Sequence, residues 1–130
     1  MDISLSIPPL PAKHSGLHLM ANLYQVSATP AMLDAQQCRV LCQTAVSHAN
    51  LTMVGDFFHG FDEGGGVTGV VVLAESHLAI HTWPESNYVT LDVFVCNYNQ
   101  DNTANARALF EALISHFSPA EVKRFETERG

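Results

Sequence analysis

The sequence predicts a single α+β domain, in which a mainly antiparallel sheet carries two helices on one face. Two apolar runs, residues 67–74 and 88–96, are rich in β-branched and aromatic residues and are typical of strands. Two stretches, from Thr29 to about residue 49 and from Asn102 to residue 117, repeat apolar residues with a helical period. Short adjacent strands with only two helices indicate that both helices pack on the same face.

Composition supports one globular domain. The chain has 130 residues, of which 47% are hydrophobic, enough for an ordinary core. It contains no run of about 18 apolar residues, so no membrane span is expected. The formal net charge is -7 with only six Lys and Arg residues, which argues against nucleic-acid binding because phosphates need a basic surface. The charge is compatible with a cationic small molecule.

The first 15 residues contain Pro8, Pro9 and Pro11 and are predicted to form a mobile arm before a domain of residues 16–130. The arm lacks a basic segment followed by an apolar one, so a cytoplasmic protein is expected. The three cysteines, an odd number, then predict reduced thiols rather than a disulfide framework.

In the first half of the chain, residues 16–26 alternate well enough for a first strand. Thr29 offers an N-cap, with Pro30 at the first helical position. Residues 51–58 predict a second strand, and the glycine-rich residues 60–66 a loop. The helix between these strands is expected to bury Met32, Leu33, Ala35, Val40, Leu41, Ala45 and Val46.

In the second half, the order of elements depends on residues 75–85. It is βαββββαβ if they form a strand and βαβββαβ if they do not. Residues 97–102 are a polar turn, in which Asp101 or Asn102 is expected to cap the second helix. Residues 121–128 predict a last edge strand. The second helix is expected to bury Ala106, Leu109, Phe110, Leu113, Ile114 and Phe117.

The strand that contains residues 69–73, GVVVL, is apolar on both faces. Helices on one side leave the other face uncovered, and a second sheet would bury it. A homodimer supplies that sheet, so the expected architecture is a sandwich completed by dimerisation.

Residues 75–85, ESHLAIHTWPE, form the densest polar cluster, and burying such groups is costly unless they have partners. Metal binding is one hypothesis, since His77 and His81 are four residues apart, with His59 and Glu75 available. In an extended strand, however, four residues span roughly 13 Å, too far for one ion. A metal site would need a local turn.

Two kinds of covalent catalysis are weak alternatives. Ser76, His81 and Glu85 supply the residue types of a hydrolytic triad, but the sequence has no GxSxG motif. A pyridoxal phosphate enzyme needs a lysine, and the chain has only Lys13 and Lys123.

A third possibility is that the Ser76 hydroxyl attacks the preceding carbonyl, and that elimination then converts residue 76 into a pyruvoyl group.

The segment AESHLAIHTWPE is preceded by GVTGVVVL and followed by DVFVC, and a GLHL segment lies near the start. Together they resemble the short prokaryotic S-adenosylmethionine decarboxylase proenzymes, which are pyruvoyl-dependent. The resemblance extends over most of the chain from Gly16 onward. It implies a self-processing decarboxylase that supplies the aminopropyl donor for spermidine and polyamine biosynthesis.

The resemblance also implies roles for individual residues. The family cleaves its own chain between the residues that correspond to Glu75 and Ser76, here into residues 1–75 and 76–130. Ser76 then becomes the pyruvoyl group, which forms a Schiff base with the substrate. His81 is expected to act in processing with Thr68 as its helper, and Cys96 is expected to be the proton donor in decarboxylation.

Three further residues are expected to bind substrate. Glu85 can hold the amino or sulfonium charge, Trp83 can stack on a ring or a cation, and Phe61 can stack on adenine. Sites of this family lie near a dimer interface, which agrees with the uncovered sheet face.

The chain also departs from the family pattern. Asn97 follows Cys96 where glycine is common, the loop after Phe61 is about one residue longer, and the cysteine often found near Tyr24 is missing. Pyruvoyl chemistry requires only an α-amino acid head, so an arginine or ornithine decarboxylase is the first alternative. A ligand-binding homologue that does not process itself is an alternative of another class.

Overall fold

The computed structural model describes residues 7–8, 11, 14–98 and 100–130. Much of the predicted arm, residues 1–15, lies outside the described residues. In chain order the elements are β1 (Gly16–Tyr24), η3 (Pro30–Met32), α1 (Ala35–His48), β2 (Met53–Gly60), β3 (Val67–Leu73), β4 (Ser76–Trp83), η4 (Pro84–Ser86), β5 (Tyr88–Cys96), α2 (Thr103–Phe117) and β6 (Glu121–Arg129), where η denotes a 3₁₀ turn.

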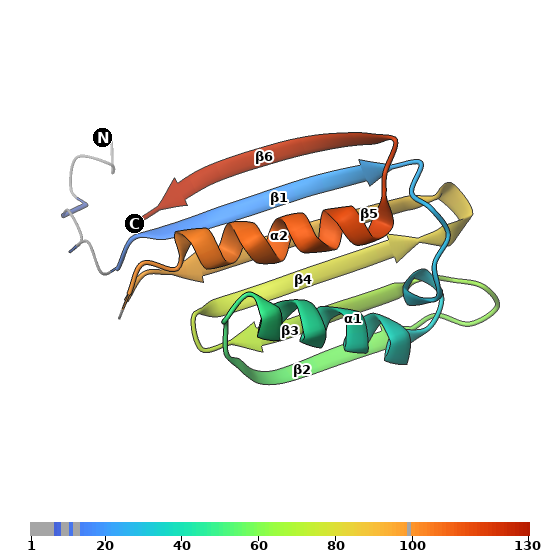
Figure 1. Ribbon diagram of the computed structural model, residues 1–130, viewed down its shortest axis with the longest axis horizontal. Helices are drawn as coiled ribbons and strands as arrows, with labels where there is room; N and C mark the ends of the chain where they lie inside the picture. Colours follow the sequence, from blue (N-terminus) through green and yellow to red (C-terminus); the bar gives the residue numbers. More distant parts are fainter. Residues whose placement is uncertain (1–6, 9–10, 12–13, 99) are drawn as a thin grey trace.

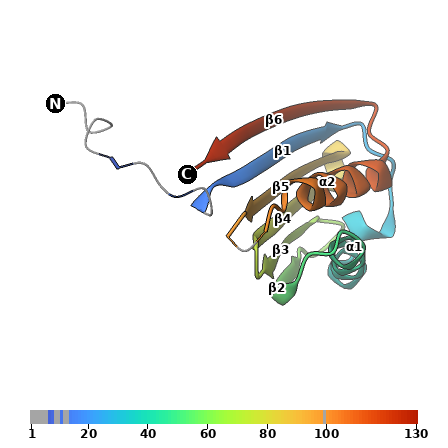
Figure 2. The same ribbon diagram turned by 60° about the vertical axis from the view of Figure 1, so that its left-hand side comes forward.

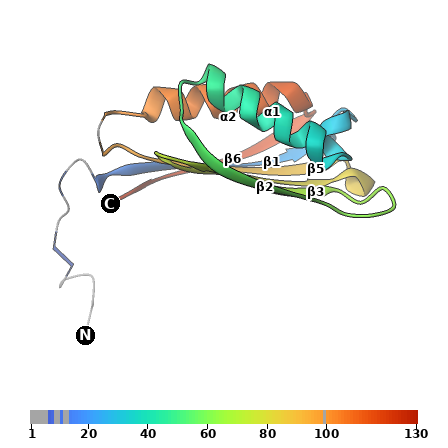
Figure 3. The ribbon, with the colours of Figure 1, turned by 90° about the horizontal axis from the view of Figure 1, so that it is seen from below.

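The six strands form one sheet with the order β2-β3-β4-β5-β1-β6, and each neighbouring pair is antiparallel (Figure 1). Helix α1 contacts β2 and β3, whereas α2 contacts β1 and β5, so the helices lie side by side over different parts of the sheet (Figure 2). Both cover the same face (Figure 3). The predicted α+β class is confirmed, and the order βαββββαβ is the correct one of the two.

The core lies between this face and the helices, because alternate residues of each central strand point toward them. The predicted stripe of α2 is confirmed, since its six residues are all buried. The strands contribute a second apolar layer, which includes Leu19, Leu23, Val67, Val71, Leu78, Ile80, Val89, Leu91, Val93 and Val95.

The predicted start of the first helix is wrong. Residues 30–32 form a separate 3₁₀ turn, and Thr29 makes no side-chain capping bond. Asp34 is the N-cap instead, because its carboxylate accepts hydrogen bonds from the backbone N–H groups of Gln36, at 2.8 Å, and Gln37, at 3.4 Å. Neither helix in the described part of the chain is long and apolar enough to span a membrane.

The buried stripe of α1 also differs from the prediction. Leu33 and Val40 are 52% and 46% exposed, whereas Cys38 and Cys42 are fully buried beside Ala45 and Val46. The two thiols lie one helical turn apart and form no disulfide. The hydrogen bond to Cys38, together with burial, raises the pKa of the Cys42 thiol. Cys38 and Cys42 are therefore core residues. A buried free cysteine behaves as a small apolar side chain, so both positions suit it.

Strand β2 begins two residues later than predicted. Asn50 has a positive φ of 60°, and the backbone N–H of Leu51 donates to the carbonyl of Val46, so Leu51 still belongs to the end of α1. The last strand, β6, lies at the opposite edge of the sheet, as predicted. Its sequence, EVKRFETER, is highly charged, which protects an edge from unwanted pairing.

No described helix or strand covers the other face of the sheet (Figure 3). This open face carries apolar side chains from several strands. Phe57, Val72, Trp83 and Phe125 are exposed there, and Met20, Val70, Ala79, Tyr88 and Phe94 are half-buried. An apolar patch of this kind typically marks an interaction surface.

Candidate functional site

A two-residue turn, Ala74 and Glu75, joins β3 to β4, and Leu73 pairs with Ser76 across it. Hydrogen bonds tie the turn to the start of β2. The backbone N–H of Ala74 donates to the carbonyl of Thr52 at 2.8 Å, and the N–H of Thr52 donates to the Glu75 carboxylate at 3.0 Å. Ser76 is half-buried, and its φ of 158° is close to extended backbone. The Glu75–Ser76 bond is therefore held in a defined position.

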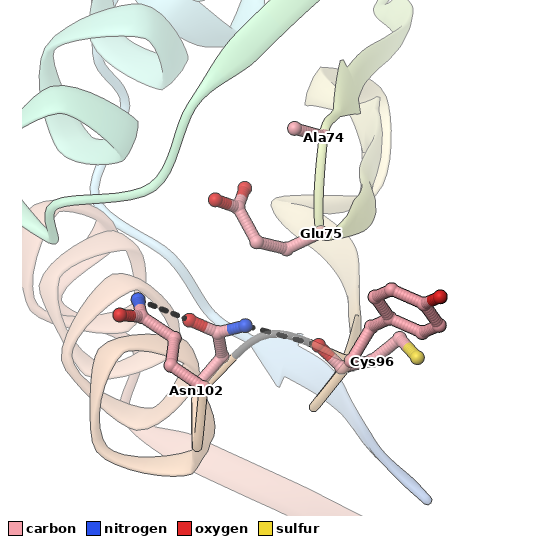
Figure 4. Close-up of a pocket in the computed structure, with 6 residues that line it drawn as sticks. Ala74, Glu75, Cys96 and Asn102 are labelled. Atoms are coloured by element: carbon pink, nitrogen blue, oxygen red, sulfur yellow. Dashed lines mark hydrogen bonds between the residues drawn. The ribbon is translucent and has the colours of Figure 1, made fainter. Parts of the chain in front are cut away.

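Cys96 ends β5 next to this turn. Its backbone N–H donates to the carbonyl oxygen of Glu75 at 2.7 Å, so the last residue of β5 contacts the bond that precedes Ser76. A cavity of about 370 Å³ opens here (Figure 4). It is lined by Ala74, Glu75, Cys96, Tyr98, Gln100 and Asn102.

A second group of predicted residues lies at the opposite end of β4. Thr68 pairs with His81 across β3 and β4, and the Thr68 hydroxyl lies 3.2 Å from Nδ1 of His81, within hydrogen-bond distance. The ring of Trp83 lies 5.9 Å from the His81 ring and 5.3 Å from that of Tyr88. Another cavity of about 370 Å³ is lined by Phe61, Gly65, Gly66, Thr68, His81, Thr82, Trp83 and Glu85.

The glycine-rich loop between β2 and β3 frames this second cavity. The backbone N–H of Phe61 donates to the carbonyl of Gly66 at 2.9 Å, which closes the loop, and the ring of Phe61 lies edge-on to His59 at 4.8 Å. A Cβ atom at Gly66 would lie 1.8 Å from the carbonyl oxygen of Thr82, so this close approach requires glycine. Phe61, Trp83 and Glu85 are all exposed at the cavity.

The structure thus divides the predicted site residues into two groups. Glu75, Ser76 and Cys96 lie at one end of the central strands, and the other predicted residues lie at the far end. Ser76 and His81 are five positions apart on one extended strand, about 17 Å at the usual rise per residue. That distance is far beyond hydrogen-bond reach within one protomer.

Comparisons with known proteins identify the family. The family model for S-adenosylmethionine decarboxylase matches residues 17–130. The chain belongs to the S-adenosylmethionine decarboxylase family. The S-adenosylmethionine decarboxylase proenzyme of Aquifex aeolicus is 38% identical over 120 residues, which cover 92% of this chain and 84% of the relative. The proenzyme of Archaeoglobus fulgidus is 35% identical over 115 residues, 88% of this chain and 97% of that one.

A solved structure agrees with this assignment. The crystal structure of the adenosylmethionine decarboxylase from Aquifex aeolicus superimposes with a TM-score of 0.80 at 36% sequence identity. The match covers 91% of this chain and 92% of the other. The family resemblance predicted from AESHLAIHTWPE is therefore confirmed, and so is the fold that it implies.

The geometry also bears on the two alternatives drawn from residue types. His77 and His81 lie on one strand, so they are about 13 Å apart and cannot share one ion. Ser76, His81 and Glu85 do not form a hydrolytic triad within the protomer, because Ser76 lies at the other end of β4. The extended conformation of β4 therefore disagrees with both the metal site and the hydrolytic triad within one protomer.

Sequence reasoning missed three polar residues around the site. Thr82 is buried and joins three segments, because its hydroxyl donates to the Met32 carbonyl and accepts from the N–H of Val67, both at 2.8 Å. Asn97 and Asn102 link the end of β5 to α2. Thr82 lies within AESHLAIHTWPE, but the motif gives it no role of its own, whereas Asn97 stands out only as a departure from the family pattern and Asn102 only as a helix cap.

Proposed function

We propose that the protein is a self-processing, pyruvoyl-dependent decarboxylase of S-adenosylmethionine that supplies the aminopropyl donor for spermidine and polyamine biosynthesis. Family membership supports the activity, and the names of the relatives support the substrate. One hydrogen bond in the structure supports the proposal most directly. The carbonyl oxygen of Glu75, immediately before Ser76, accepts a hydrogen bond from the Cys96 backbone N–H at 2.7 Å.

That hydrogen bond suits the first step of chain cleavage. The Ser76 hydroxyl adds to the Glu75 carbonyl carbon, the carbonyl oxygen takes the negative charge, and the peptide C–N bond breaks. The hydroxyl proton ends on the nitrogen of residue 76, which leaves an ester and a free amine. A preorganised N–H donor at the developing oxyanion is typically worth about a hundredfold in rate.

Elimination completes the cleavage. A base removes the α-proton of residue 76, and the bond between Cβ and the ester oxygen breaks, which releases residues 1–75 with a free Glu75 α-carboxylate. The resulting dehydroalanine tautomerises to an imine. Water adds to the imine and ammonia leaves, so that residues 76–130 begin with a pyruvoyl group. We assign the base to His81, with Thr68 holding its ring at 3.2 Å.

The residues around position 76 fit such a group, since the 370 Å³ cavity that includes Cys96 lies directly beside the Glu75–Ser76 bond. A pyruvoyl group supplies a ketone for the substrate amine and a conjugated carbonyl that accepts electrons when carbon dioxide leaves. Cys96 then donates a proton to the substrate carbon. At the second cavity, Phe61 would stack on the adenine of the substrate and Trp83 on a ring or a cation. Glu85 would bind the positive charge of the substrate.

The proposed roles require two protomers, because His81 lies about 17 Å from Ser76 along its own strand. We infer that the open faces of two sheets pack against each other. The two-fold axis lies between the two sheets, perpendicular to β4, and passes over the point of β4 midway between Ser76 and His81. The strands of the two sheets then run in opposite directions. The Glu75–Ser76 bond and Cys96 of one protomer then lie at the same end of the dimer as Thr68 and His81 of the partner subunit, and each dimer has two complete sites.

The test is an intact-mass spectrum under denaturing conditions for the wild type, for Ser76→Ala and for Ser47→Ala as a matched control on the exposed side of α1. The wild type and the control should separate into residues 1–75 and an N-terminally blocked 76–130. Ser76→Ala should remain whole and inactive. Cyanoborohydride with S-adenosylmethionine should add a reduced adduct to the second fragment.

The same experiment separates the alternatives. An adduct formed with arginine or ornithine, and not with S-adenosylmethionine, would assign a different substrate. A wild-type chain that stays whole and unmodified would contradict the proposal and favour a ligand-binding homologue. Decarboxylation by the whole Ser76→Ala chain would exclude the pyruvoyl mechanism.

A further inference from the structure

Asn102 is a polar side chain that is only 3% exposed, at the N-terminal end of α2. It occupies the N-cap position, where asparagine usually accepts a hydrogen bond from the first turn of the helix. Here its side chain makes no such bond. The carboxylate of Asp101 accepts from the backbone N–H of Thr103 at 2.9 Å instead. The Asn102 amide is thus available for another contact.

That contact is to Cys96. Nδ2 of Asn102 donates to the backbone carbonyl of Cys96 at 2.9 Å, and Oδ1 accepts from the side-chain amide of Gln100 at 2.9 Å (Figure 4). Because an amide side chain has distinct donor and acceptor ends, the bond from Gln100 fixes which end faces Cys96. The donor end is the one that the Cys96 carbonyl requires.

Asn102 is itself anchored to the residue that follows Cys96. Its backbone N–H donates to Oδ1 of Asn97 at 2.8 Å, and the N–H of Asn97 donates to the carbonyl of Ser15 at 3.0 Å. A glycine at position 97 would have no side chain that could accept this bond. The start of α2 is therefore joined to the end of β5 at two consecutive residues, Cys96 and Asn97.

The Cys96 backbone in turn holds the Glu75 carbonyl, through the 2.7 Å bond from its N–H. On the other side, Glu75 is held by its carboxylate, which accepts from the Thr52 N–H at 3.0 Å. One hydrogen-bonded path thus runs from the start of β2 through the scissile carbonyl and Cys96 to α2. Asn102 is the side chain that closes it at the helix.

We propose that Asn102 is a positioning residue for chain cleavage. It fixes the Cys96 backbone so that its N–H points at the Glu75 carbonyl oxygen, and the same contact places Cys96 at the cavity. Asn102 acts only through Cys96 and takes no part in bond making. This inference rests on the proposed self-processing function, and it adds a residue to which that function had given no role.

The test is Asn102→Asp, measured as the rate of cleavage of freshly made chain on denaturing gels. Aspartate has nearly the same size and is an equally good N-cap, so α2 should be retained, although burying a charge and losing the bond to the Cys96 carbonyl should lower the melting temperature somewhat. Its carboxylate has no hydrogen to donate to the Cys96 carbonyl. Cleavage should slow roughly tenfold, as expected when the donor N–H loses its alignment.

The matched control is Asn105→Asp, which adds the same charge in the first turn of α2 without a bond to Cys96. It should cleave at the wild-type rate. Hydroxylamine, which cleaves esters, identifies the slow step. It should release little extra fragment from Asn102→Asp, because ester formation is slowed, whereas His81→Ala should accumulate ester.

Two outcomes would overturn the proposal: wild-type cleavage by Asn102→Asp, or an equal slowing in Asn105→Asp. If Asn102→Asp fails to fold, Asn97→Ala is the second test, since it removes the acceptor of the Asn102 N–H and should slow cleavage severalfold in a chain that still folds. Wild-type cleavage by that variant would then reject the proposal. A wild-type chain that never cleaves would instead reject the proposed function itself.

Discussion

His77 lies in the open face of the sheet, where its ring is 5.8 Å from that of Phe94. Burial lowers its pKa below the usual 6.5, and nearby His18 and Arg129 lower it further, while Asp92 acts in the opposite direction. The folded chain therefore favours the neutral imidazole more than the unfolded chain does. It belongs to the ESH motif, but its surroundings suit a packed side chain better than a proton carrier.

This shift predicts a pH dependence of stability. Because the folded pKa lies below the unfolded 6.5, the contribution of His77 is complete above about pH 6.5 and is lost as the pH falls through the window toward the folded value. Urea unfolding of the uncleaved Ser76→Ala chain between pH 7.5 and 5 measures the loss. Adding His77→Gln should flatten the curve in this window, and two parallel curves would contradict the assignment.

At the scale of elements, Thr82 determines how β4 meets its neighbours. It is 4% exposed, and its hydroxyl bonds both the N–H that opens β3 and the last carbonyl of η3. These bonds hold the turn before α1 against the sheet at the end where Thr68 and His81 lie. The second cavity depends on that junction, since Thr82 itself is part of its lining.

Thr82→Val should therefore destabilise the protein although its shape is preserved. It leaves a buried N–H and a buried carbonyl without their partner, at a cost of about 2–4 kcal/mol. Chemical denaturation of uncleaved chains measures the difference. Thr44→Val, on the exposed side of α1, is the matched control and should change the free energy of unfolding by about 0.5 kcal/mol or less. Equal effects of both variants would contradict the role of Thr82.

At the scale of the whole molecule, the separation of Ser76 from His81 predicts complementation between two inactive variants. A heterodimer of Ser76→Ala and His81→Ala contains one site with both defects and one site with neither. Co-expressed chains with different tags should therefore yield cleavage of the His81→Ala protomer alone. If His81 acted on its own chain, neither protomer would be cleaved, and mass spectrometry distinguishes the two results.

The open face should also couple assembly to cleavage. Val70 lies on this face between Phe57 and Ala79, so Val70→Arg places a charge in the proposed interface. Sedimentation should show a monomer, and the chain should stay uncleaved. Val40→Arg makes the same change on the exposed side of α1 and should leave both the dimer and cleavage intact. A Val70→Arg monomer that cleaves normally would refute the two-protomer site.

Local patterns in the sequence determined most of the elements of this protein and the motif that identifies its family. Alternation and helical periodicity act within a few residues, so β3, β5 and the buried stripe of α2 were predictable, as was the family from AESHLAIHTWPE. The start of α1 was not, because both Thr29 and Asp34 are acceptable caps. Only the packing of Met32 and Thr82 decides between them.

The site itself depended on tertiary structure. The sequence places Ser76 and His81 close together, but an extended strand separates them, because β4 pairs along its whole length with β3 and β5. Conversely, Glu75, Cys96 and Asn102 are distant in sequence and meet only through the register of β4 on β5 and the return of the chain into α2. The residue types indicated which reactions the side chains could perform. The long-range pairing of the strands decided which of these side chains can lie in one site.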